Sequence, residues 1–73
     1  MSRQYLIDLR EKAGESQQEV ADAIGISRQY YSFIEAGQRQ KRMDLTLATR
    51  LARHFTVDVS VIVAHEDALT TAL

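Results

Sequence analysis

The stretch "SQQEVADAIGISRQYYSFIEAGQR", residues 16–39, carries the start and end signals of two short helices in succession. Ser16 followed three residues later by Glu19 forms a capping box, in which each residue satisfies a backbone donor of the other at a helix start. Gly25 can adopt the left-handed geometry that ends a helix in a sharp turn. Ser27 is a favoured N-cap for a helix that restarts at once. The stretch therefore predicts two consecutive helices joined at one glycine.

Helical signals continue on both sides of this stretch. Residues 2–13 place apolar side chains on one helical stripe and end at Gly14. Asp44 is a cap for a fourth helix, and Asp58 would cap a fifth. The expected inner face of the fourth helix comprises Leu45, Ala48, Leu51, Ala52 and Phe55. With 73 residues, no proline and no internal repeat, the chain is expected to be one small all-α domain.

Positive charge is concentrated in residues 27–42, although the whole chain has a formal net charge of −1. The only acid of this stretch is Glu35. Its basic residues are Arg28, Arg39, Lys41 and Arg42. Local potential, and not net charge, steers a polyanion to a patch. On charge alone, a solvated loop that is basic by chance fits equally well.

Two short helices joined in this way form a helix-turn-helix, and the residues resemble those of the Cro and phage-repressor (Xre-like) family. The matching features are Gln17 at the first helix start, Ala21 where the two helices touch, Gly25 in the turn, the inward Tyr31 and Ile34, and the ending "IEAG". The resemblance covers residues 5 to about 63. It implies a five-helix, lambda-repressor-like DNA-binding domain, with the motif at helices 2 and 3, that is usually dimeric and regulates transcription. We place this domain at residues 1–66 and expect residues 67–73 to be a frayed tail.

The second helix of such a motif presents its outward face to the major groove. On a helical wheel this face, the candidate for base readout, consists of Arg28, Gln29, Ser32 and Phe33. Gln29 has the paired donor and acceptor that fit adenine, Arg28 has the fork that fits guanine, and Phe33 can pack on a thymine methyl. Candidates for phosphate contact are Gln17, Gln18, Ser27, Arg39, Lys41 and Arg42.

Several of these side chains have a second interpretation. Arg28 fits a phosphate contact as well as a base contact, and Phe33 could pack on a loop or on a partner subunit. Gln29 and Ser32 could be merely solvated. Glu35 would repel DNA unless it is neutralised, and the resemblance implies a structural ion pair between Glu35 and Arg10 near the end of the first helix.

The segment "TVDVSVIVAH", residues 56–65, alternates apolar and polar residues in a way that is typical of a strand. We nevertheless predict a helix, because Asp58 is a cap and the family places a helix here. The segment is too apolar to remain in water, which favours a homodimer formed through it. The candidate dimer contacts are Val59, Val61, Ile62 and Val63.

Other functional classes receive little support from the sequence. There is no glycine-rich phosphate loop and no nucleophile beside a base, so we expect no enzyme activity. "HED", residues 65–67, places neighbouring side chains in different directions on a helix, so we expect no metal site. We also expect no cofactor and no small-molecule ligand, because the chain has no ligand domain. The absence of cysteine, of a signal peptide and of a long apolar run favours a cytoplasmic protein without a membrane span.

The expected function is that of a sequence-specific regulator of transcription, a repressor bound as a homodimer to an inverted-repeat operator on double-stranded DNA. The alternative is a protein-interaction module of the same fold, antitoxin-like or bound by an antirepressor. Such a module would have no need of Arg28 and Gln29 on its outward face.

Overall fold

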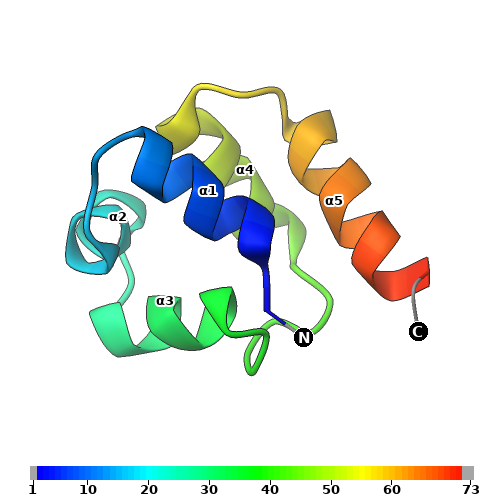
Figure 1. The fold of residues 1–73 in the computed structure, drawn as a ribbon, viewed down its shortest axis with the longest axis horizontal. Coiled ribbons are helices and arrows are strands. Elements are labelled where there is room, and N and C mark those ends of the chain that lie inside the picture. The colour runs from blue at the N-terminus through cyan, green and yellow to red at the C-terminus, as the bar shows by residue number, and fades with distance from the viewer. Residues whose placement is uncertain (1, 72–73) are drawn as a thin grey trace.

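The computed structural model describes residues 2–71, which form five helices and no strand. In chain order the helices are α1 (Gln4–Lys12), α2 (Gln17–Ile24), α3 (Arg28–Glu35), α4 (Leu45–Phe55) and α5 (Val59–Thr71). The predicted all-α class with five helices is confirmed. Figure 1 shows α1 and α4 in the middle of the molecule, with α2 on one side of them, α5 on the other, and α3 along one edge.

The caps and the turn between α2 and α3 follow the local sequence signals. Ser16 Oγ accepts a hydrogen bond from the Glu19 backbone N–H at 3.1 Å, and Glu19 Oε1 accepts one from the Ser16 N–H at 2.9 Å. The bond from the Ser16 backbone lowers the pKa of Glu19, because it stabilises the carboxylate. Gly25 ends α2 with φ of 78°, a conformation that suits glycine. Ser27 then caps α3 by accepting from the Tyr30 N–H.

One apolar core joins all five helices. Its fully or nearly fully buried members are Leu6, Val20, Ala21, Ile24, Tyr31, Ile34, Leu47, Ala48, Leu51, Ala52 and Ile62. α2 packs on α3 and α4, α4 packs on α5, and α1 contacts α3. Tyr31 and Ile34 point inward as predicted, and both are fully buried. Because this face of α3 is packed in the core, the opposite face of α3 lies on the surface.

The prediction for the inner face of α4 is wrong at Leu45. Leu45 is 75% exposed, whereas Leu47 is buried. With 3.6 residues per turn, the buried stripe of α4 is centred on Ala48, Leu51 and Phe55, and Leu45 lies roughly a quarter turn away from that centre. Leu45 thus belongs to the molecular surface at the start of the helix.

The C-terminal segment is helical, as predicted, and not a strand. Asp58 Oδ1 accepts from the Ser60 N–H at 2.8 Å, and this bond lowers the pKa of Asp58. Residues 67–71, which we assigned to a tail, continue α5, and the remaining two tail residues, 72–73, lie outside the described part of the chain.

Ile62 was expected at a dimer contact, and the structure contradicts this. Its side chain is fully buried in the core, because it faces α4 from α5. Val59 is partly buried against the same core. Val61 and Val63 remain on the surface, 38% and 52% exposed. None of the helices in residues 2–71 is both long and apolar enough to cross a membrane.

Candidate nucleic-acid interface

The outward face of α3 carries the four side chains predicted to read bases. Arg28 and Gln29, in the first turn of the helix, are exposed, and Ser32 and Phe33, one turn later, are half-buried. The face is continuous along α3, which lies at an edge of the molecule where no other helix covers it (Figure 1). Its N-terminal end, which enters a major groove first in this motif, thus presents the two long polar side chains.

The basic loop after α3 lies beside the same face. Arg39, Lys41 and Arg42 are all exposed. The Arg39 guanidinium carbon lies 6.0 Å from the centroid of the Phe33 ring, a weak cation–π distance. Phe33 therefore packs against the loop from within the same chain, which is one of its two alternative roles. That Phe33 also packs on a thymine methyl stays a prediction.

The polar residues predicted to contact phosphate at the helix starts are already engaged within the chain. Gln17 Nε2 donates to Glu35 Oε1 at 2.9 Å, and Gln18 Nε2 donates to Asp22 Oδ1 at 2.8 Å. The Ser27 hydroxyl oxygen accepts from a backbone N–H as the cap of α3. In the first turn of α2 the Glu19 N–H already donates to Ser16 Oγ. The first N–H groups of a helix have no partner within the helix, so the backbone donors that this end can offer an anion are those of Gln17 and Gln18.

Glu35, the acid of α3, points inward and is neutralised there. Its side chain is 3% exposed, and its two oxygens accept from Arg10 Nε at 2.8 Å and Arg10 Nη2 at 3.3 Å. Burial opposes the charge on Glu35, but the hydrogen bonds from Arg10 and Gln17 outweigh it and hold the pKa of this carboxyl below its ordinary value. The hydrogen bond to Glu35 raises the pKa of Arg10. The pair implied by the family resemblance is therefore present, and it leaves the outer face of α3 without a negative charge.

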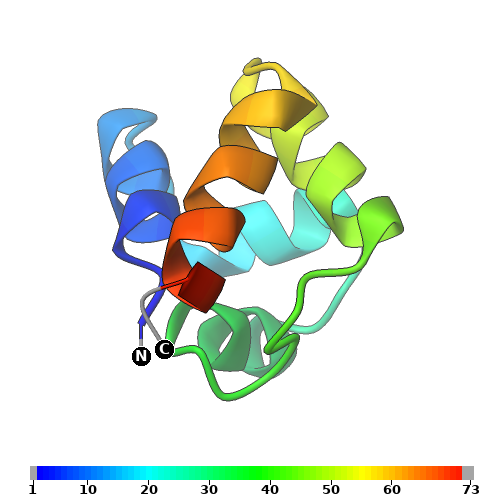
Figure 2. The same ribbon diagram turned by 90° about the vertical axis from the view of Figure 1, so that its right-hand side faces the viewer.

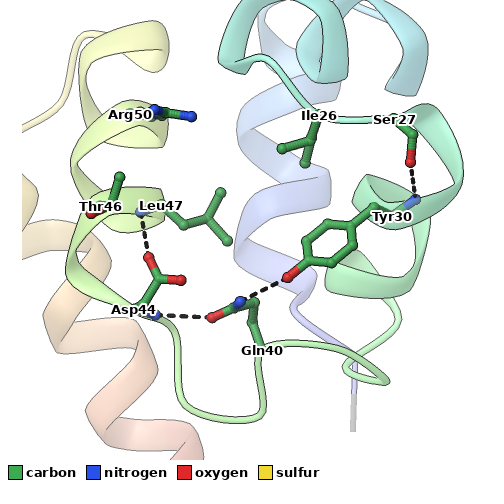
Figure 3. A pocket seen from close by; sticks show the side chains of 8 residues that line it. All are labelled: Ile26, Ser27, Tyr30, Gln40, Asp44, Thr46, Leu47 and Arg50. Carbon is green, nitrogen blue, oxygen red and sulfur yellow. Dashed lines mark hydrogen bonds between the residues drawn. The ribbon is translucent and has the colours of Figure 1, made fainter.

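A small hollow between α3 and α4 shows how the basic loop is attached (Figure 3). Gln40 stands between the two helices: its Nε2 donates to the Tyr30 hydroxyl at 2.7 Å, and its Oε1 accepts from the Asp44 N–H at 3.1 Å. Gln40 has φ of 54°, a left-handed conformation that costs energy for a residue with a side chain. Asp44 in turn accepts from the Leu47 N–H at 2.7 Å and caps α4. The loop is thus fixed by side chains at its middle.

Sequence reasoning missed two residues that shape this region, Gln40 and Arg3. Arg3 is only 2% exposed, although it stands near the start of the chain in a polar stretch. It bonds to residues more than 30 positions away, such as Ile34 (separation 31) and Glu66 (separation 63). No local pattern signals contacts of that range, and only the positive charge of Arg3 could have hinted at a partner among the acids.

The histidines take part in contacts between segments that are far apart in the sequence. His54 Nε2 lies 2.9 Å from Glu15 Oε1, and the ring of His65 stacks on Tyr5 at 4.6 Å. In residues 2–71 no group of three or more His, Cys, Asp or Glu side chains is placed to hold a metal ion. The arrangement that the chain does offer is an exposed helix face flanked by basic side chains.

The comparison with protein families agrees with this geometry. A helix-turn-helix family model matches residues 6–62, which is most of the chain. The chain belongs to the helix-turn-helix family of the Cro and phage-repressor (Xre-like) type. Its domain is therefore a DNA-binding domain of transcriptional regulators, a family that is not typically enzymatic. Searches of curated proteins and of solved structures returned no match.

Proposed function

We propose that this helix-turn-helix protein is a sequence-specific repressor that binds an inverted-repeat operator as a homodimer. The observation that carries the proposal is the pairing of Arg28 and Gln29, exposed at the start of α3, with an exposed basic loop on the same side. The two side chains suit base edges in the major groove, and the loop suits the phosphates beside it. A protein bound in this way over a promoter would block other proteins from the same DNA.

Dimerisation is supported by the amount of sequence that one subunit can read and by the exposed apolar surface of α5. One recognition helix contacts only a few base pairs, and two copies related by a dyad double that number. The domain measures 30 × 24 × 22 Å, so two copies side by side fit recognition helices about 34 Å apart, one turn of DNA. Val61 and Val63 are the candidates for the contact, with Val59 at its edge; Ile62 is excluded by its burial.

The decisive experiment separates base readout from phosphate contact. Genomic fragments bound by the protein are selected and sequenced, and binding is then measured on a selected site and on a random-sequence duplex over a salt series. Gln29→Ala should weaken binding to the selected site by about 1–3 kcal/mol and relax the base preference at one position of that site. Its affinity for the random duplex should stay unchanged. Lys41→Ala should weaken both DNAs alike and lower the salt slope by about one.

A matched control is Arg53→Ala, which also removes one exposed positive charge. Arg53 belongs to the last turn of α4, and that end of α4 lies far from α3 (Figure 1). The control should leave binding to both duplexes unchanged. If Gln29→Ala lowers affinity for the random duplex as much as for the selected site, Gln29 contacts the backbone and the proposed readout is wrong. If the wild-type protein enriches no fragment, DNA binding itself is refuted and the protein-interaction module is favoured.

The dimer is tested on the selected operator. Inserting about five base pairs between the half-sites turns one half-site to the far side of the duplex and should abolish most of the affinity gained from the second subunit. Unchanged affinity after the insertion would mean that each subunit binds alone.

A further inference from the structure

Arg3 is a buried cation whose hydrogen-bonding capacity is used completely. A guanidinium group has five N–H donors. The acceptors of Arg3 are Ile34 O at 2.8 Å, Arg39 O at 3.0 Å, Gln40 O, Glu66 Oε2 at 2.8 Å and Glu66 Oε1 at 3.0 Å. The Arg3 backbone N–H also donates to Glu35 O at 2.7 Å. Such a set of contacts fixes the guanidinium in one position and one orientation.

These acceptors come from three separate parts of the fold. Ile34 O belongs to the last turn of α3, where the helix dipole favours a positive charge. Arg39 O and Gln40 O belong to the loop that carries the exposed basic side chains. Glu66 belongs to α5, and it also accepts from the Tyr5 hydroxyl at 2.5 Å. In Figure 2 the N-terminal segment lies at one side of the molecule, close to the loop after α3 and to the C-terminal half of α5.

The loop between α3 and α4 has no regular secondary structure to hold its shape. At its start, the backbone N–H groups of residues 38 and 39 both donate to Phe33 O. Beyond that point, Arg3 binds the carbonyls of residues 39 and 40 from the interior, and the Gln40 side chain binds Tyr30 and Asp44 from the other side. The shape of residues 39–42 therefore depends on two side chains, of which Arg3 is the one outside the loop.

We propose that Arg3 is a positioning residue for DNA binding: it holds the loop of residues 38–42 in a preformed shape, so that Arg39, Lys41 and Arg42 meet phosphates without first being ordered. The proposal rests on the proposed function of this face. A loop that is already ordered before binding does not lose backbone entropy when it binds DNA. Each residue that must be ordered on binding lowers the affinity by roughly a factor of ten. Arg3 itself is buried and touches no phosphate.

The test uses Arg3→Lys, which keeps the charge but has three donors on a compact group that cannot reach four separate residues. The probe is a random-sequence duplex, and affinities are compared at a temperature where circular dichroism shows each variant to be fully folded. Arg3→Lys should bind about tenfold more weakly than the wild type, the cost of ordering one residue's backbone. Lys41→Ala should lower affinity less in the Arg3→Lys background than in the wild type, because Lys41 then no longer stands in a fixed position.

The matched control is Arg10→Lys, which alters another arginine that is paired with a carboxylate inside the fold. Arg10 is partly buried and bonds to Glu35 and Glu15, neither of which belongs to the loop. The control should lower the melting temperature but leave affinity for the random duplex within about twofold. Equal losses of affinity in Arg3→Lys and Arg10→Lys would overturn the proposal, since the effect would then come from general destabilisation. Strictly additive effects of Arg3→Lys and Lys41→Ala would overturn it as well.

If Arg3→Lys does not fold, Glu66→Gln provides a milder change. The amide oxygen can still accept from Arg3, but the carboxylate charge that anchors the guanidinium from α5 is removed. Affinity for the random duplex should fall several-fold while the protein remains folded, and unchanged affinity would refute the role of Arg3. A wild-type protein that binds neither the random duplex nor genomic fragments would refute the proposed function instead, so the two failures are distinguishable.

Discussion

Replacing Arg10 with methionine should destabilise the domain strongly, because it leaves a buried carboxylate without its counter-ion. Glu35 is 3% exposed and receives two hydrogen bonds from Arg10, at 2.8 and 3.3 Å. After the substitution it keeps the bond from Gln17 Nε2 at 2.9 Å. The Tyr31 hydroxyl lies in the same cluster, where burial and then the neighbouring carboxylate raise its pKa, so it stays neutral. Methionine fills much of the volume of the arginine stem but offers no donor.

The size of the effect follows from the burial of the pair. Removing one partner of a buried ion pair costs about 3–5 kcal/mol. We expect about 3 kcal/mol here, the lower end of that range, because one hydrogen bond to Glu35 survives and Arg10 itself is 16% exposed to solvent. For a domain of this size each kcal/mol corresponds to about 4–8 °C in Tm, so Tm should fall on the order of 12 to 24 °C.

The assay is urea unfolding of Arg10→Met beside the double variant Arg10→Met with Glu35→Gln. The glutamine removes the stranded charge but keeps an oxygen that can accept from Gln17. If the cost arises from the uncompensated charge, the double variant should recover most of the lost stability. A double variant no more stable than Arg10→Met would refute this reasoning and indicate that Arg10 matters through packing alone.

A pH series tests the same reasoning from another direction. In the wild type the pKa of Glu35 lies below its ordinary value of 4.5, so the charged carboxylate stabilises the fold above about pH 4.5 and this contribution is lost as the pH falls through the folded pKa. In Arg10→Met the burial of Glu35 is largely unopposed and should raise its pKa. The stability difference between Arg10→Met and the double variant should therefore shrink toward low pH, as Glu35 takes up a proton.

Three further predictions concern the turn, a cap and the dimer. Gly25→Ala should lower the free energy of unfolding, measured in urea, by about 1–2 kcal/mol, because alanine is strained in the left-handed backbone conformation. No steric cost is added, since the new Cβ would lie 3.9 Å from Arg50 Nη1, an ordinary contact distance. Asp44→Ala should cost about 1 kcal/mol in the same assay, since it removes the cap bond from the Leu47 N–H. Val63→Gln should weaken dimerisation, measured by sedimentation on and off operator DNA, with Tm changed by no more than about 2 °C, because the side chain is 52% exposed.

Sequence reasoning placed correctly the elements whose start and end signals lie within a few neighbouring residues. The capping box joins positions three apart, and Gly25 and Ser27 mark the end of one helix and the start of the next. Such contacts form whatever the rest of the chain does, so their residue types indicate them directly. The outward face of α3 followed from helix periodicity once these limits were set.

Contacts between distant segments could not be predicted in the same way. The alternating apolar residues of α5 gave no indication that Ile62 faces the core while Val61 and Val63 face out; that distinction depends on which side of α5 meets α4. Leu45 was misplaced for a similar reason, since the centre of the buried stripe is set by neighbouring helices. The burial of Arg3 depends on three chain segments meeting at one point, which only the folded arrangement reveals.

The placement of individual charges explains how a chain with a net charge of −1 can present a basic surface beside α3. Arg39, Lys41 and Arg42 are exposed on the loop after α3. Glu35, the acid of α3, is directed inward and paired with Arg10. The charges that decide an encounter with DNA are then those within about a Debye length, ~8 Å at physiological salt, of the phosphates. Two variants with the same net charge, Lys41→Ala and Arg53→Ala, should therefore differ in DNA affinity, because only the first alters the loop beside α3.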